Sequence, residues 1–266
     1  MRITILGSGT GVPSLRRSSC SVLIQTAQAA LLLDSGAGTI RRLLEVGVSI
    51  EKITHIFYSH FHPDHTSDLV PFLFATKYPP IYERRKPFTV VAPKGFVAFY
   101  EELKGAYGKW IELAPGLMKI VELDAGDRDH FDFSLFDVDT LPMNHTETSL
   151  AYRITGPKGH AVVYSGDTDF CENLVELARG ADVLICESAF PDDMKVPGHL
   201  TPSLAGEIAA QAGVKKLVLT HFYPECDRAD PVRECRKTYE GPLVLAEDLM
   251  EIEVRSQRFD RKGSNK

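Results

Sequence analysis

Short apolar runs, separated by glycine, proline and polar turn residues, recur along the chain. Such runs are typical of β-strands. They predict strands at Ile3–Leu6, Val22–Thr26, Leu31–Asp34, Ile53–Tyr58, Phe88–Ala92, Lys119–Leu123, Phe133–Asp139, Ala151–Thr155, Ala161–Ser165, Val183–Cys186 and Leu217–Thr220. Apolar positions three or four residues apart predict helices at Thr39–Val46, Asp68–Ala75, Gly95–Tyr107, Cys171–Ala178, Pro202–Ala212 and Pro231–Tyr239.

Consecutive strands dominate the first half of the chain, and strands alternate with helices in the second half. Two sheets packed together with helices outside would satisfy this order, and so would one doubly wound sheet. No linker or repeat divides the sequence. We therefore expect a single α/β domain over residues 1–254, followed by a polar C-terminal tail at 255–266.

Composition narrows the class of protein. The 266 residues carry a formal net charge of -6, which argues against a broadly basic surface for nucleic acid. The five cysteines show no C-x-x-C spacing, so reduced thiols are expected. No apolar stretch reaches membrane-spanning or signal-peptide length, and we expect a cytoplasmic protein without membrane contact.

Polar residues follow several predicted strands at the point where each strand ends. They are His60, Asp64, Asp167, Glu187 and His221. Open α/β sheets place their sites beyond the carboxyl ends of strands. These residues therefore predict a functional edge of the sheet.

The densest candidate chemistry is the motif His60-Phe61-His62-Pro63-Asp64-His65. Side chains two apart in extended backbone share a face, so His60 and His62 can approach one ion. Pro63 favours extended backbone at His62. Thr66 or Ser67 is expected to cap the next helix, and the turn before it to aim Asp64 and His65 at a second ion. Nitrogen and oxygen donors of this kind suit zinc, iron or manganese.

Three further candidate ligands lie downstream in similar settings. His145 follows the strand that ends at Asp139, Asp167 lies in a Gly-Asp-Thr stretch, and His221 follows an apolar strand. Gly166 lets the Asp167 carboxylate approach closely. A lone histidine at a strand end is more often structural, so the order of these residues carries the argument.

That order resembles the metallo-β-lactamase superfamily, and within it the ribonuclease Z branch. The glycine-rich turn at Leu6–Pro13, the stretch Leu33–Gly36 and the stretch Gly198–Thr201 also have counterparts there. The resemblance implies a four-layer αβ/βα sandwich, metals at the sheet edge and a homodimer. It implies two metal sites bridged by Asp167, with the remaining ligands being His60, His62 and His145 at one ion and Asp64, His65 and His221 at the other.

Two divalent ions, with zinc expected and manganese or iron as alternatives, can share a hydroxide that attacks phosphorus. Asp64 would be both a ligand and an orienter of this nucleophile. The resemblance implies that His199 contacts the phosphoryl group or assists the leaving oxygen, and Glu187 is a candidate hydrogen-bond partner for it. The turn Gly7–Gly11 lacks the lysine of a P-loop and is expected to be structural.

The substrate is less well defined. Enzymes resembling ribonuclease Z usually insert a long arm that grips transfer RNA, but the stretch between His145 and Asp167 predicts only a hairpin. We therefore expect a metal-dependent phosphodiesterase for a nucleotide or other small phosphodiester. The aromatic and basic segment Lys77–Pro87 is a candidate nucleobase contact, a dimer contact or an ordinary surface loop, and the surface loop is the favoured interpretation.

Other functions stay open. The runner-up is a transfer RNA 3′-end endonuclease, so RNA is the less favoured substrate. Thioester, lactam and sulfate-ester hydrolysis need the same chemistry. A non-catalytic metal-binding interaction protein is the alternative of a different class.

Overall fold

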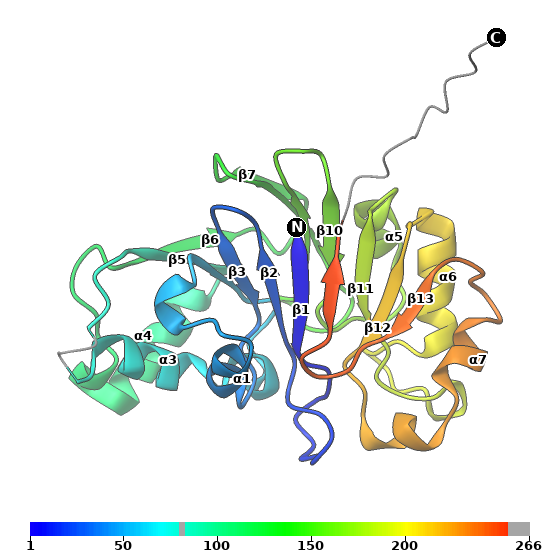
Figure 1. The fold of residues 1–266 in the computed structure, drawn as a ribbon, viewed down its shortest axis with the longest axis horizontal. Helices are drawn as coiled ribbons and strands as arrows, with labels where there is room; N and C mark the ends of the chain where they lie inside the picture. Colours follow the sequence, from blue (N-terminus) through cyan, green and yellow to red (C-terminus); the bar gives the residue numbers. More distant parts are fainter. Residues whose placement is uncertain (80–82, 255–266) are drawn as a thin grey trace, which may run out of the picture.

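Two β-sheets pack face to face between two layers of helices (Figure 1). The computed structural model describes residues 1–79 and 83–254, and the expected tail at 255–266 lies outside them. The first sheet has the order β14-β1-β2-β3-β4-β5-β6, and the second has the order β13-β12-β11-β10-β9-β8-β7. Both sheets are mixed, because β3 to β6 and β10 to β13 run parallel while the other neighbours are antiparallel.

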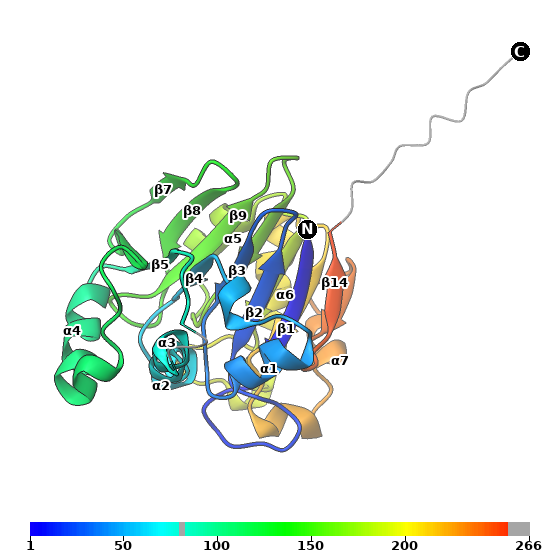
Figure 2. The ribbon, with the colours of Figure 1, turned by 60° about the vertical axis from the view of Figure 1, so that its left-hand side comes forward.

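The strands of the first sheet are β1 Arg2–Gly7, β2 Ser21–Gln25, β3 Ala30–Leu33, β4 His55–Phe57, β5 Phe88–Pro93, β6 Met118–Leu123 and β14 Glu251–Glu253. Those of the second are β7 Asp129–Asp132, β8 Asp137–Pro142, β9 Leu150–Thr155, β10 Ala161–Tyr164, β11 Val183–Glu187, β12 Leu217–Thr220 and β13 Leu243–Leu245. Figure 2 shows the late strand β14 beside β1, so the end of the described chain returns to the first sheet.

Helices cover the outer face of each sheet. On the first sheet lie α1 Thr39–Glu45, α2 Pro63–Thr66, α3 Leu69–Lys77 and α4 Phe96–Tyr107. On the second lie α5 Glu172–Ala178, α6 Pro202–Ala212 and α7 Pro231–Cys235. Short 3-10 turns are η1 Ile50–Lys52, η3 Gly108–Trp110, η4 Asp192–Met194 and η5 Pro224–Arg228. Within the described ranges, no helix has the length and apolar character needed to span a bilayer.

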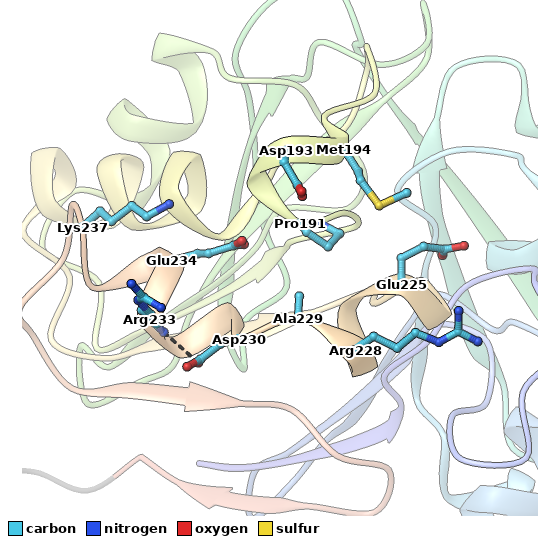
Figure 3. Close-up of a pocket in the computed structure, with 10 residues that line it drawn as sticks. All are labelled: Pro191, Asp193, Met194, Glu225, Arg228, Ala229, Asp230, Arg233, Glu234 and Lys237. Atoms are coloured by element: carbon cyan, nitrogen blue, oxygen red, sulfur yellow. Dashed lines mark hydrogen bonds between the residues drawn. The ribbon is translucent and has the colours of Figure 1, made fainter.

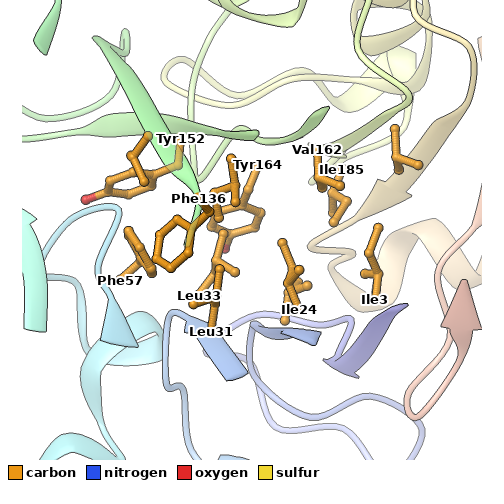
Figure 4. Packing of buried hydrophobic residues seen from close by; sticks show 14 of the residues in the cluster. Ile3, Ile24, Leu31, Leu33, Phe57, Phe136, Tyr152, Val162, Tyr164 and Ile185 are labelled. Atoms are coloured by element: carbon orange, nitrogen blue, oxygen red, sulfur yellow. The ribbon is translucent and has the colours of Figure 1, made fainter. Parts of the chain in front are cut away.

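The strands read as unbroken apolar runs because both of their faces are buried. In β3, Leu31 and Leu33 face the second sheet, while Leu32 faces the helices on the other side. In β11, Ile185 faces the first sheet and Leu184 faces α5 and α6. Figure 4 shows side chains of both sheets meeting in the central layer. The four-layer sandwich is therefore confirmed, and the single doubly wound sheet is wrong.

The expected strand Phe133–Asp139 is wrong in its first part, because the strand β8 begins only at Asp137. Residues 133–136 form a turn between β7 and β8, where Phe133 N donates to Phe136 O at 3.0 Å. Ser134 has a φ of 63°, which a strand does not allow. The rings of Phe133 and Phe136 lie 5.1 Å apart and both pack against Phe57. The apolar run covers the end of the central layer rather than joining the sheet.

The expected capping of the helix after the histidine motif is also wrong. α2 begins at Pro63, with His62 before it, and the hydroxyl of Thr66 donates back to His62 O at 3.0 Å. The hydroxyl of Ser67 bonds back to Pro63 O in the same way. Proline is favoured at a first helical position, and hydroxyls bonded to the preceding turn are not available as caps.

Two smaller differences concern the C-terminal part. The expected helix Pro231–Tyr239 ends at Cys235, because the following backbone closes with i→i−3 bonds such as Lys237 N to Glu234 O at 3.0 Å. The strands β13 and β14 were not predicted, because each has only three residues.

Candidate metal centre

The polar residues expected past the strand ends come together at one edge of the sandwich. Their side chains form two groups in which the donor atoms all lie within 4.8 Å of one another. The first group consists of His60, His62, His145 and Asp167, and the second of Asp64, His65 and His221. Asp167 and His221 also form such a group with His199.

The first group draws on both sheets. His60 and His62 follow β4, and their ring centroids lie 4.6 Å apart. His62 has the extended ψ of 147° that Pro63 was expected to favour. His145, which follows β8, places its Nε2 3.2 Å from His62 Nδ1. Two ring nitrogens this close can bind one metal ion together.

The carboxylate of Asp167 lies between the two groups. Its Oδ2 is 3.9 Å from His60 Nε2 and 3.3 Å from His65 Nε2. Its Oδ1 is 3.4 Å from His221 Nε2, which is in turn 3.6 Å from Asp64 Oδ2. One buried carboxylate thus faces donor atoms of both groups.

Several donor atoms of this cluster lack hydrogen-bond partners of their own. Nε2 of His60, His65 and His221 and Oδ1 of Asp167 are shielded from solvent and have no hydrogen-bond partner among the described residues. A buried polar atom without a partner is costly. Imidazole and carboxylate donors aimed at one point are the ligands that divalent transition metals prefer. The cluster therefore fits a divalent metal and is a candidate metal-binding site.

The electrostatics of the cluster favour a cation. Burial lowers the pKa of His60, His62 and His145, which keeps their ring nitrogens free of extra protons. Burial opposes the charged form of His65 as well, but the charges of Asp167 and Asp34 outweigh it and raise its pKa well above the ordinary value. A position that attracts a proton so strongly also attracts a metal ion.

Hydrogen bonds at Nδ1, the ring nitrogen that faces away from the centre, orient three imidazoles. Nδ1 of His65 donates to Asp34 Oδ2 at 2.7 Å, and Nδ1 of His145 donates to Gly198 O at 2.8 Å. The hydroxyl of Ser59 donates to Asp34 Oδ2 at 2.7 Å, so it accepts from His60 Nδ1, 3.0 Å away. Each bond leaves the Nε2 lone pair free to face the centre.

Asp34 is a candidate positioning residue to which the sequence analysis gave no role, although it lies in the stretch Leu33–Gly36. Its carboxylate is fully buried, and besides His65 and Ser59 it accepts a hydrogen bond from the hydroxyl of Tyr164 at 2.7 Å. Tyr164 in turn lies 3.1 Å from Cys20 Sγ. Asp34 also has a φ of 54°, an uncommon value for a residue other than glycine. A charged residue directly after an entirely apolar strand was the available signal.

Glycines with positive φ let the loops approach closely. Gly166, with a φ of 56°, lies where a Cβ would be 2.6 Å from Ser59 Cβ. Gly166 was expected to relieve crowding, and the neighbour that it accommodates is Ser59. Gly198, with a φ of 83°, lies where a Cβ would be 3.2 Å from His145 Nδ1. Both glycines thus keep space beside residues of the cluster.

The expected hydrogen bond between His199 and Glu187 is present, with 3.0 Å between Nδ1 and Oε1. Glu187 is buried at the end of β11 and accepts three backbone N–H bonds, from Thr168, Ala189 and Leu200. Burial lowers the pKa of His199, but the hydrogen bond and charge of Glu187 outweigh it and raise that pKa above its usual value. The contact with Glu187 therefore favours the protonated form of His199 beside the cluster.

The glycine-rich turn after β1 reaches the cluster through its backbone. Gly11 N donates to Asp64 Oδ2 at 3.0 Å. A Cβ at Gly11 would lie 3.4 Å from Asp64 Cβ, so the backbone runs close to this side chain. The turn is structural, as expected, and it holds one carboxylate in place.

The aromatic and basic segment Lys77–Pro87 lies apart from these groups. Its Pro80–Tyr82 stretch lies outside the described residues. Arg84 is buried and donates to the backbone carbonyls of Ile50, Ile53 and Lys86. Because its guanidinium serves the backbone, Arg84 is not available to hold a phosphate, and this part of the nucleobase-contact interpretation is wrong.

Comparison with known proteins identifies the family of this chain. The model of the beta-lactamase superfamily domain matches residues 30–222. An uncharacterized protein of Mycobacterium tuberculosis is 31% identical over 257 residues, covering 95% of this chain and 92% of the relative. Ribonuclease Z of Methanosarcina mazei is 30% identical over 310 residues, covering 96% of this chain and 98% of the relative.

Solved structures of similar fold cover almost the whole chain. The metallo-beta-lactamase fold protein YhfI of Bacillus subtilis has a TM-score of 0.80 and 24% identity, over 95% of this chain and 99% of that one. The short form of human tRNase Z has a TM-score of 0.76 and 26% identity, over 96% of this chain and 100% of that one. The chain therefore belongs to the metallo-β-lactamase superfamily, in its ribonuclease Z-like branch, and is a hydrolase of that fold.

Proposed function

We propose that this hydrolase is a phosphodiesterase that acts on a nucleotide or another small phosphodiester with two divalent metal ions. The observation that carries the proposal is the position of Asp167 between two groups of donors. In the proposed assignment, His60, His62 and His145 hold one ion, Asp64, His65 and His221 hold the other, and Asp167 bridges them. Zinc is the favoured metal, with manganese and iron as alternatives.

Two such ions would supply Lewis acidity, which lowers the pKa of water and stabilises charge on phosphate oxygens. The chain's own residues would position the reactants. Asp64 is held by Gly11 N through Oδ2, and would orient the attacking water with its carboxylate. The buried donors without partners provide binding positions for divalent cations. The charge of these cations would in turn attract an anionic substrate.

His199 would serve the leaving group. Its Nδ1 is fixed by Glu187, so its Nε2 is free to donate a proton to a phosphoryl or leaving oxygen. The hydrogen bond and charge of Glu187 raise the pKa of His199, which favours the form that carries this proton. Glu187 is a positioning residue in this scheme, because the imidazole separates it from the substrate.

The expected size of the substrate rests on what lies between His145 and Asp167. That stretch holds only the antiparallel hairpin of β9 and β10. The alignment with the Methanosarcina mazei ribonuclease Z runs over 310 positions, more than the 266 residues of this chain, so that relative carries inserted segments. A small diester is the substrate that fits a centre without a long inserted arm.

The transfer RNA 3′-end endonuclease is the second candidate. It is favoured by the 30% identity to ribonuclease Z over 96% of this chain, because that relative acts on RNA.

A homodimer, implied by the family, stays a prediction that light scattering would check.

Metal analysis combined with hydrolysis of bis(p-nitrophenyl) phosphate tests the proposal. We expect the wild type to bind about two metal ions per chain and to hydrolyse the diester. Asp64→Ala and His62→Ala should lose metal and activity together. Asp139→Ala and His130→Ala are matched controls, since these residues form an outlying ion pair at 3.1 Å with His130 exposed. Metal binding without turnover of diesters, monoesters or lactams would instead indicate a binding protein.

Precursor transfer RNA belongs in the same panel. Cleavage of it at a kcat/KM far above that for small diesters would favour the endonuclease over the small-molecule phosphodiesterase.

A further inference from the structure

Two aromatic rings stand beside the histidines of the centre. Phe190 and Tyr223 are stacked, with ring centroids 4.2 Å apart and an interplanar angle of 20°. The Phe190 ring lies 6.3 Å from the His199 ring, and the Tyr223 ring lies 6.2 Å from the His221 ring. Both side chains are only partly buried, so the pair presents an open aromatic surface next to the place where a phosphoryl group would bind.

The two backbones that carry these rings are tied together. Tyr223 N donates to Ala189 O at 3.1 Å, directly before Phe190. The segment after Tyr223 is tied to the N-terminal loop, because Asp227 pairs with Arg16 at 3.0 Å and with Arg17 at 3.1 Å. These contacts hold the backbone segments that carry the aromatic pair in place.

A hollow of about 740 Å³ runs along the same two segments. Pro191, which follows Phe190, lines it, as does Glu225, two residues after Tyr223. Figure 3 shows Glu225, Met194 and Arg228 gathered on one side of it. Its volume lies within the range of about 300–1,000 Å³ that is usual for small-molecule sites.

The hollow offers polar groups without partners. Glu225 Oε2 is shielded from solvent and accepts no hydrogen bond from the described residues. Arg228 is exposed and makes no ion pair within the described part of the chain. A nucleoside has an aromatic face for stacking and N–H and O–H donors for a free carboxylate oxygen. An apolar acyl chain would leave these polar groups unpaired.

We propose that the Phe190–Tyr223 pair and the hollow beside it, with Glu225, form a subsite for the nucleoside arm of the diester substrate. This inference rests on the proposed function and narrows its substrate class to nucleoside diesters. The reacting phosphate lies at the centre beside His199, and the base stacks on the open face of the ring pair. The Glu225 carboxylate, whose Oε2 is shielded from solvent in this structure, turns toward the hollow and accepts a hydrogen bond from the nucleoside.

Two chromogenic diesters with the same reacting centre test this subsite. Thymidine 5′-(p-nitrophenyl phosphate) and methyl p-nitrophenyl phosphate share a leaving group and differ in the retained arm. Because the thymine base can stack on the aromatic pair, we expect kcat/KM for the thymidine compound to be at least about tenfold higher. Phe190→Leu and Glu225→Leu should each reduce this preference by about tenfold.

Phe74→Leu is the matched control. Phe74 also stacks on a tyrosine, Tyr78, at 5.3 Å, but it lies on α3 and is exposed. This variant should keep the full preference for the thymidine compound. Thermal unfolding of each variant separates loss of the subsite from loss of the fold.

Direct binding gives a readout that needs no turnover. By isothermal titration calorimetry, thymidine 5′-monophosphate should bind about tenfold more tightly than ribose 5-phosphate, and Phe190→Leu should remove the difference. Equal kcat/KM for the two diesters, with equal affinity for the two monophosphates, overturns the subsite and leaves the phosphodiesterase standing. If neither diester is hydrolysed, the proposed function fails, and the monophosphate comparison still decides the subsite.

Discussion

His65 Nδ1 donates a hydrogen bond of 2.7 Å to Oδ2 of Asp34, and both side chains are completely buried. The same oxygen accepts from the hydroxyls of Ser59 and Tyr164. Asp34 is thus bound on all sides and is not free to act as a ligand itself. Its effect is to fix the ring of His65 and to strengthen the donor atom that faces the centre.

We expect Asp34→Asn to weaken metal binding by about 10- to 100-fold, because an amide neither carries the charge nor fixes the His65 tautomer. Competition with a chromogenic chelator would measure the affinity. Asp139→Asn, which alters the outlying pair with His130, is the control and should keep full affinity. Wild-type affinity in Asp34→Asn would show that this hydrogen bond has no influence on the metal.

We expect His199→Ala to lower kcat by about 10²- to 10⁴-fold while metal content stays near that of the wild type. The reason is that, in the proposed mechanism, His199 donates a proton to the reacting groups, while its Nδ1 contacts Glu187. Measuring metal per chain alongside kcat separates the two roles, with His130→Ala as the matched histidine variant. Loss of metal from His199→Ala would make this histidine a ligand.

Acid is expected to release the metal. Burial lowers the pKa of His60, His62 and His145, so these ligands stay unprotonated at neutral pH, and protons compete with metal only as the pH falls. Metal content and activity should therefore persist through the pH range in which a free imidazole titrates, about 6.5, and fall together only at lower pH. Dialysis across a pH series followed by metal analysis gives the profile, and full retention at about pH 4.5 speaks against histidine ligands.

Gly198 and Gly213 both have a positive φ. Replacing each of them with alanine separates the cost of backbone strain from an effect on the metal centre. Gly198→Ala and Gly213→Ala each force a left-handed conformation, which costs about 1–2 kcal/mol in the free energy of unfolding. A Cβ at 198 would also press on His145 Nδ1 at 3.2 Å, while a Cβ at 213 meets nothing within 4 Å. Only Gly198→Ala should lower metal affinity and kcat, and equal activities for the two variants would contradict this role.

Most of the fold was predictable from the sequence because the strands are short apolar runs between clear turn residues. The turn at Phe133–Phe136 between β7 and β8 was not predictable. Its aromatic residues are as apolar as those of a strand, and the turn depends on packing against Phe57. The short strands β13 and β14 carry too few residues for a pattern. Periodicity also could not separate two sheets from one, because burial on both faces removes the alternation.

The candidate centre was predictable where residue types are rare and their spacing is tight. The motif from His60 to His65 indicated metal ligands without any structure, and the contact between His199 and Glu187 was expected. Asp34 and the pair Phe190–Tyr223 were not expected, because their roles depend on neighbours far away in sequence. Tyr164, for example, is 130 residues from the carboxylate to which it donates.

The donors of the centre come from both sheets and from positions between 60 and 221. During synthesis the His60–His65 motif leaves the ribosome well before His221 is made. A nascent chain therefore offers only part of the donor set, and full affinity arises when the late strand β12 is in place. Under the proposed assignment, the complete metal site therefore forms only after the second sheet has folded against the first.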